Sequence, residues 1–177
     1  YAAVLLKPKA AFYEDPAWSQ LGVDWKTELA PHYETVSRML GVTDNPGFGQ
    51  QDEYLKQTAE TMGAADTFGP TPNGIYFGEA GEYRDDPFFG GIGPTRMGCN
   101  FCGQCLTGCP HGAKNSLDKN YLYLAQRLGA VIVPQKKVAK IVPAENGGYH
   151  VHMRDPVKKR RTRSEEHTSE LQSLLII

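Results

Sequence analysis

The chain has 177 residues, of which 40% are hydrophobic and 22% are charged, and its formal net charge is −1. The near-zero charge argues against a general nucleic-acid binder, and no apolar run reaches the roughly 18 residues of a membrane-spanning helix. The 19 glycines and 12 prolines indicate long loops between the regular elements. The sequence begins at Tyr1 without a secretory signal, and we expect it to start inside a longer protein.

Two segments in the first half of the chain have the signals of helices. Residues 24–41 begin at Asp24, a good N-cap, and end at a glycine. Pro31 lies within this segment, where we expect it to kink the helix or to begin a second one. Residues 51–62 place apolar side chains on one face and stop before Gly63, which predicts a second amphipathic helix.

Residues 116–128 carry the clearest helix signal. Ser116 is the expected cap, apolar side chains recur at i, i+4, i+7 and i+11, and Gly129 follows as the expected stop. The apolar stripe of this predicted helix consists of Leu117, Tyr121, Leu124 and Leu128.

Strand signals are concentrated in the last third of the chain. Residues 131–133 form a short β-branched run directly after the third helix. Residues 138–142 and 149–153 flank an Asn-Gly-Gly turn and therefore predict a hairpin. The stretch 67–98 is rich in Gly, Pro and Asp, and only residues 75–77 suggest a strand within it. Such a long irregular stretch is uncommon in a compact domain unless it serves a function.

Residues 163–173 match, letter for letter, the conceptual translation of a common sequencing-adapter oligonucleotide. A polar C-terminal tail is the alternative, but no fold argument predicts that string. We therefore expect residues 163–177 to be an artefactual tail, which is excluded from the fold prediction.

All four cysteines lie within eleven residues, in the pattern Cys99-x2-Cys102-x2-Cys105-x3-Cys109-Pro110. This spacing matches the bacterial ferredoxin signature, whose thiolates hold [4Fe–4S] clusters. In two-cluster ferredoxins, however, the fourth cysteine ligates the other cluster, and this chain has no second cysteine run. A zinc site with four thiolates is a second interpretation. Disulfides or buried thiols that brace the loop are a third. The spacing alone does not decide between these three interpretations.

The residues around the cysteines resemble a known family. A Gly-Ala-Lys-Asn-Ser-Leu segment at 112–117 leads into Asn-Tyr-Leu at 120–122, and further matching blocks lie upstream at 24–25, 39–42 and 86–91. Together with the cysteine run, these blocks resemble the flavin-dependent glucose–methanol–choline (GMC) oxidoreductases, in particular their cholesterol-oxidase-like bacterial branch. The resemblance extends over most of the chain up to the predicted hairpin.

This resemblance implies part of an FAD-dependent enzyme that oxidises a small-molecule alcohol, with a sterol suggested by the branch, by hydride transfer to the flavin. It also implies that the backbone N–H and C=O of Val138 meet the FAD adenine. The family's glycine-rich FAD motif and its catalytic histidine have no match in this sequence, so we expect no catalytic residue here. The histidines His32, His111, His150 and His152 are accordingly expected in loops or at the surface.

The expected organisation has four parts. Residues 1–98 form a helical, loop-rich segment on the cap or substrate side, and residues 99–113 form the cysteine-rich loop. Residues 114–162 supply part of an FAD-binding domain, and residues 163–177 are the tail. The predicted fold is therefore mixed α/β, a partial FAD-binding domain with a cap segment and Gly/Pro-rich loops. The alternative is a ferredoxin-type electron-transfer module, in which the four cysteines hold a [4Fe–4S] cluster.

Overall fold

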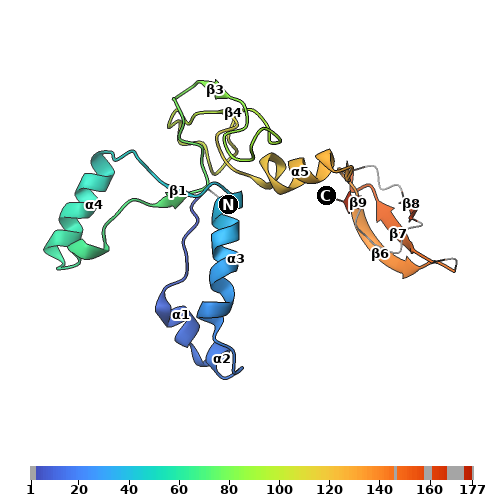
Figure 1. Ribbon diagram of the computed structural model, residues 1–177, viewed down its shortest axis with the longest axis horizontal. Helices are drawn as coiled ribbons and strands as arrows, with labels where there is room; N and C mark the ends of the chain where they lie inside the picture. The colour runs from blue at the N-terminus through green and yellow to red at the C-terminus, as the bar shows by residue number, and fades with distance from the viewer. Residues whose placement is uncertain (1–2, 146, 158–160, 167–173, 177) are drawn as a thin grey trace. The chain divides into compact units, whose positions relative to one another are not determined.

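The computed structural model describes residues 3–145, 147–157, 161–166 and 174–176. The contacts between Cα atoms divide the chain into two units, Tyr1–Tyr121 and Leu122–Ile177. Figure 1 shows their helices and strands, and the mixture confirms the predicted α/β class in its coarse form. Within the described ranges, no helix is both long and apolar enough to cross a bilayer.

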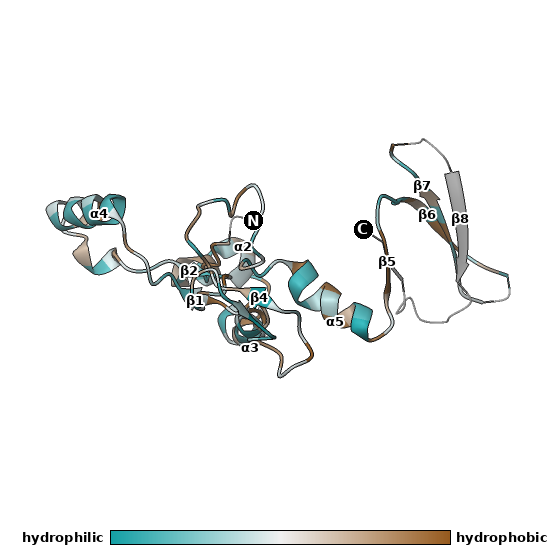
Figure 2. Ribbon diagram, turned by 90° about the horizontal axis from the view of Figure 1, so that it is seen from above, coloured by the Kyte–Doolittle hydropathy of each residue, from teal (hydrophilic) through white to brown (hydrophobic). Residues whose placement is uncertain are grey.

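The first unit contains most of the helices. They are α1 (Ala10–Glu14), α2 (Pro16–Ser19), α3 (Trp25–Met39) and α4 (Gln50–Thr61), with a 3₁₀ turn η1 (Ala65–Thr67). Asp24 caps α3 as predicted, since its carboxylate accepts a hydrogen bond from the backbone N–H of Thr27 at 3.3 Å. Pro31 lies inside α3 and does not end it. The second predicted helix is confirmed as α4, none of whose residues is buried, and Figure 2 colours most of its residues as hydrophilic.

The irregular stretch of the first unit is organised by very short strands. β1 (Thr43–Asp44) pairs antiparallel with β2 (Pro72–Asn73), and β3 (Tyr83–Arg84) pairs antiparallel with β4 (Arg96–Met97). The strand suggested at residues 75–77 is reduced to a single bridge between Ile75 and Lys114. These pairs bring distant parts of the loop together, and β4 leads directly into the cysteines.

Polar side chains occupy much of the interior of the first unit. The buried apolar residues are Ala3, Ile75, Met97 and Ala113, and the buried polar residues are Asn73, Arg96, Asn115 and Asn120. Three half-buried cysteines pack against the small apolar cluster of Ala3, Ile75 and Ala113. Because so little apolar surface is buried here, hydrogen bonds to the buried polar groups must hold the loops in place.

The third predicted helix is correct only in its second part. The segment begins as a 3₁₀ turn, η2 (Leu117–Lys119), and becomes helical only in α5 (Tyr121–Arg127). Ser116 does not cap the backbone, because its hydroxyl hydrogen-bonds to the Asp118 carboxylate at 2.5 Å. Asn120, with φ −133° and ψ −100°, separates the two pieces, and its side chain accepts a hydrogen bond from the N–H of Tyr121.

The predicted apolar stripe of that helix is also largely unburied. Leu117 is 54% exposed and Leu128 is 90% exposed in the structure. Gly129 has φ +95° and ends α5 as expected. The periodicity therefore located the end of the helix, but the buried Asn120 changed its beginning.

The second unit contains the predicted hairpin. β6 (Lys137–Pro143) pairs antiparallel with β7 (Tyr149–Arg154), and β7 pairs with β8 (Arg161–Glu166), in the sheet order β6-β7-β8. Gly147 and Gly148 take the positive φ angles that the turn requires, while Asn146 lies outside the described residues. The alternation is confirmed in β7, where Val151 and Met153 are buried.

Two strands involve the C-terminal tail. The predicted strand at 131–133 is confirmed as β5 (Val131–Val133), which pairs in parallel with β9 (Leu174–Ile176). Most of β8 and all of β9 therefore fall within the segment expected to be artefactual. The adapter-like origin of residues 163–177 stays a prediction.

Candidate functional site

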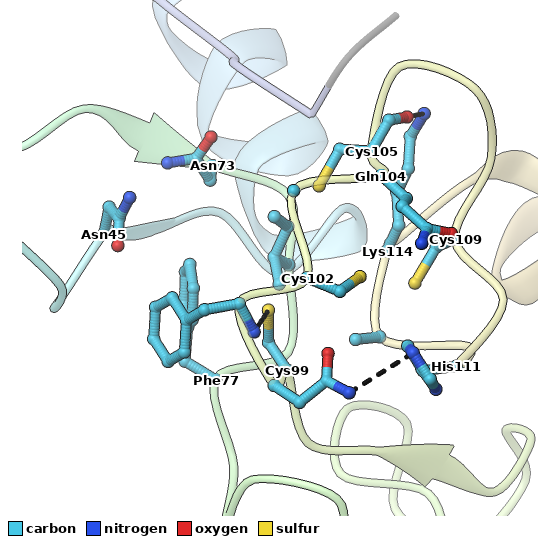
Figure 3. A pocket seen from close by; sticks show the side chains of 15 residues that line it. Asn45, Asn73, Phe77, Cys99, Cys102, Gln104, Cys105, Cys109, His111 and Lys114 are labelled. Atoms are coloured by element: carbon cyan, nitrogen blue, oxygen red, sulfur yellow. Dashed lines mark hydrogen bonds between the residues drawn. The ribbon is translucent and has the colours of Figure 1, made fainter.

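All four cysteines line one cavity in the first unit (Figure 3). Its volume is about 190 Å³. The apolar part of the wall includes Ile75, Phe77 and Phe101, and the polar part includes His111 and Lys114. The four thiols are Cys99, Cys102, Cys105 and Cys109, and each of them is free in the structure.

The cysteine loop begins in a close crossing of two backbone segments. At Gly98, an added Cβ would lie only 2.0 Å from the carbonyl oxygen of Glu79, so only glycine fits. The next residue, Cys99, donates its backbone N–H to the carbonyl of Tyr76 at 3.0 Å. This contact sets the first thiol beside the segment that carries Ile75 and Phe77.

Arg96 holds the other end of the loop. It is only 2% exposed, and burial lowers the pKa of its guanidinium. Its Nε donates to the carbonyl of Gly112 at 2.7 Å, and its Nη2 donates to the carbonyls of Ala113 and Lys114 at 2.9 and 3.0 Å. Its Nη1 donates to the side-chain oxygen of Asn115. One side chain therefore fixes the backbone that follows the last cysteine.

Two further polar side chains tie this backbone to its surroundings. The side-chain N–H of Asn115 donates to the carbonyl of Leu40 at 2.7 Å, which connects the loop to the residue that ends α3. The ammonium group of Lys114 donates to the carbonyl of Cys105 at 2.9 Å, across the cysteine run. The loop is thus held at both ends and across its middle.

The Cys99 thiol is disfavoured as a free thiolate. Burial raises its pKa, and the neighbouring thiols of the run raise it further. The backbone N–H of Phe101 opposes this effect, since it donates to the Cys99 sulfur at 3.4 Å.

The environment of the Cys109 thiol shifts its pKa in the opposite direction from that of Cys99. Partial burial raises its pKa, but hydrogen bonds from the backbone N–H groups of Lys114, His111, Ala113 and Gly112 outweigh burial, so its pKa lies below the ordinary value. These N–H groups belong to the segment that Arg96 fixes. The arrangement favours an anionic sulfur at Cys109.

The described residues include no group of three or more His, Cys, Asp or Glu side chains placed to hold a single metal ion. His111 contacts Asn100, with 3.2 Å between its Nε2 and the Asn100 Nδ2. It lies at the wall of the cavity, consistent with the loop position expected for it.

Val138, the residue expected beside FAD, lies in the second unit. It belongs to β6 at the edge of the described three-stranded sheet, pairs with Met153 and is 37% exposed. A bulge interrupts the pairing between Val138 and Lys140. Its contact with FAD stays a prediction.

The roles of Arg96 and Asn115 were not predicted from the sequence. Asn115 lies within the family-like block at 112–117 and Arg96 follows the block at 86–91, but spacing does not reveal that an arginine will be buried. The one available signal was a Gly-rich, cysteine-rich loop with few apolar residues, because such a loop needs polar side chains to satisfy its backbone.

Comparison with known protein families identifies the class of this chain. The model of the family described as GMC oxidoreductase matches residues 94–170, which include the cysteine loop, α5 and the hairpin. Residues 94–170 of the chain therefore match the GMC oxidoreductase family, as the sequence blocks predicted.

The curated relatives are cholesterol oxidases. The chain is 46% identical over 156 residues to the cholesterol oxidase of two Mycobacterium tuberculosis strains, CDC 1551 / Oshkosh and ATCC 25618 / H37Rv, a match that covers 85% of the chain and 27% of each relative. It is 44% identical over 147 residues to that of Acinetobacter baumannii, covering 81% of the chain and 26% of the relative. The chain therefore spans about a quarter of the length of these proteins. No solved structure matches it significantly.

Proposed function

We propose that this chain is part of an FAD-dependent oxidoreductase that oxidises the hydroxyl group of a sterol. The observation that carries the proposal is the 46% identity, over 85% of the chain, to proteins named cholesterol oxidase. The match to the GMC oxidoreductase family supports oxidation of an alcohol. FAD, when bound, would accept the hydride from the carbinol carbon.

Within this proposal, residues 114–162 contribute to the FAD-binding domain, and residues 1–98 lie on the cap or substrate side. The order of α5, β5 and the β6–β7 hairpin supports the first assignment in a general way, because an FAD-binding domain of the α/β class is built from helices and strands in succession. The irregular loops around β3 and β4 support the second, since binding surfaces are often built from loops on a rigid frame.

Val138 would contact the FAD adenine through its main chain. This assignment fits the position of β6, because an edge strand carries N–H and C=O groups that no neighbouring strand pairs. The partial exposure of Val138 and the bulge beside it are compatible with a planar ring approaching the backbone there. A hydrogen bond from the backbone would orient the adenine without any requirement on the side chain.

The direct test is anaerobic addition of cholesterol to the intact protein that contains this chain. We expect the visible absorption of bound flavin to be bleached by cholesterol, because hydride transfer reduces the flavin. A simple secondary alcohol such as cyclohexanol is the control and should bleach it far more slowly. Purified protein without flavin would contradict the proposal, as would flavin that neither alcohol reduces.

The assignment of Val138 predicts a specific pattern of variants. Val138→Pro removes the backbone N–H and should weaken FAD binding by about fivefold, equivalent to the loss of one hydrogen bond worth about 1 kcal/mol. Val138→Ala keeps the N–H and should bind FAD normally. Ile141→Pro, in the same strand, controls for disruption of β6. Equal weakening in the two proline variants, measured by flavin titration of the apoprotein, would refute a specific contact at Val138.

A further inference from the structure

We propose that Cys99, Cys102, Cys105 and Cys109 bind a [4Fe–4S] cluster in the cavity that they line. The four thiols come from one loop, face a shared space and are free in the structure. This site is separate from the alcohol chemistry proposed above and does not depend on it.

The position of the fourth thiol is the strongest observation. The spacing of the run is that of ferredoxins in which the last cysteine serves a different cluster. Here Cys109 lines the same cavity as the other three cysteines, so one site has a complete set of four ligands. The chain has no second cysteine run, and this arrangement requires none.

The size of the site favours a cluster over a single ion. A tetrahedral zinc ion draws four sulfurs to about 2.3 Å from one point. The described side chains include no such group. In a [4Fe–4S] cube each thiolate binds a different iron, so the four sulfurs lie on a much larger tetrahedron. A cavity of about 190 Å³ bordered by four separate thiols suits that arrangement.

The backbone around the cavity supplies hydrogen bonds of the kind that stabilise cluster sulfurs. The N–H of Phe101 donates to the Cys99 sulfur at 3.4 Å, and backbone N–H groups of residues 111–114 surround the Cys109 sulfur. The Lys114 ammonium group, bound to the carbonyl of Cys105, adds positive charge beside the run. These groups offset the negative charge that four thiolates and a cluster bring together.

The loop bends around the cavity, with Cys102 and Phe101 on its exposed side. Phe101, Gly103 and Gly108 take positive φ angles of 58°, 73° and 124°, so the chain curls between successive cysteines. Phe77 and Phe101 stack with 5.8 Å between ring centroids at the apolar side of the cavity. An apolar wall limits the access of water to a cluster and so protects it.

Binding a pre-assembled cluster requires no net oxidation or reduction. Each of the four thiols forms one bond to iron and releases its proton to solvent, and the ligands that carried the cluster leave. The irons and the sulfides keep their oxidation states throughout this exchange.

The test is the composition of the intact protein, produced with added iron and recovered without oxygen. We expect about four irons and about four acid-labile sulfides per chain, and no stoichiometric zinc. After reduction with dithionite, low-temperature electron paramagnetic resonance should show a reduced cluster. Stoichiometric zinc without sulfide would overturn the proposal, and so would a metal-free protein with paired disulfides.

Serine variants test the role of the fourth thiol. Cys109→Ser should lower iron and sulfide at least tenfold, as should Cys102→Ser. Leu106→Ser is the matched control, since it lies between two of the cysteines, is 76% exposed and does not line the cavity. Full iron in Cys109→Ser beside loss in Cys102→Ser would overturn the four-thiol site.

Flavin content, measured on the same samples, separates this proposal from the proposed function. Flavin without iron would refute the cluster alone, and iron with sulfide but without flavin would refute the flavoenzyme alone. The protection of amides in β6 and β7 reports whether a serine variant is still folded outside the loop.

Discussion

Each of the two units of the chain is stabilised by a different kind of interaction within itself. In the second unit, backbone ladders join β6, β7 and β8, and alternating side chains such as Val151 and Met153 are buried on one face. In the first unit the strands around the cysteine loop are only two residues long, and the buried guanidinium of Arg96 satisfies the backbone instead. A hairpin repeats one local interaction, whereas the loop depends on a few side chains, each of which is hard to replace.

The sharpest test of this difference is Arg96→Met. The change should lower the free energy of unfolding of the first unit by about 3 kcal/mol or more, because it removes four hydrogen bonds and takes away the donor that Arg96 supplies to the Gly112 carbonyl and to the buried side-chain oxygen of Asn115. Hydrogen exchange should show lost protection at residues 112–115, while protection in β6 and β7 is kept. Arg84→Met, at the exposed residue that pairs with Arg96 in the β3–β4 sheet, is the control. If Arg84→Met lowered the stability and the amide protection at residues 112–115 as much as Arg96→Met, the role given to Arg96 would be contradicted.

A second test concerns the close crossing at Gly98. Gly98→Ala would place a Cβ 2.0 Å from the carbonyl oxygen of Glu79, so the backbone must shift, at a cost of about 2–3 kcal/mol. The thermal unfolding midpoint of the intact protein should fall. Gly69→Ala, where an added Cβ meets nothing within 4 Å, should leave it nearly unchanged. If Gly98→Ala were as stable as Gly69→Ala, the crossing would be looser than described.

The smallest predicted effect is a dependence on pH. Asp86 accepts backbone N–H groups from Phe88, Phe89, Gly91 and Gly93. Desolvation raises the pKa of its carboxyl group, but these hydrogen bonds outweigh it, so the pKa in the folded state lies below the ordinary value.

The sign of that effect follows from the lowered pKa. A depressed pKa contributes stability above about pH 4, the unfolded value, and this stability is lost as the pH falls through the folded value. Asp86→Asn should therefore be less stable than the wild type at pH 7, and the difference should shrink on acidification. Thermal midpoints measured from pH 7 to pH 3 would reveal it, with Asp66→Asn as an exposed control. A difference that grows towards low pH would reverse the assigned sign.

Local patterns predicted the elements that local interactions form. The hairpin and the helices α3 and α4 followed from alternation, capping and glycine stops, because each depends on neighbours in sequence. β5 followed from its β-branched run, although its partner β9 lies far away in the sequence. The start of the third helix was predicted wrongly because the buried Asn120 leaves the helical conformation and its side chain accepts the N–H of Tyr121, a local interaction that apolar periodicity does not contain.

The candidate site, too, was predicted from the sequence only where local spacing determines it. The cysteine spacing predicted that several thiols would gather, since two-residue gaps leave little freedom. That Cys109 would join the same cavity depended on Arg96, which reaches the backbone 16 to 18 residues later, and on Asn115, which reaches Leu40. Contacts over such separations have no signature in a single sequence.

The central proposal is that the chain is part of a flavoenzyme that also carries a cysteine-ligated cluster. The most direct measurement is the content of flavin, iron, acid-labile sulfide and zinc in one anaerobic preparation of the intact protein. We predict one flavin per chain, with iron and sulfide in equal amounts. Iron and sulfide without any flavin would contradict the account.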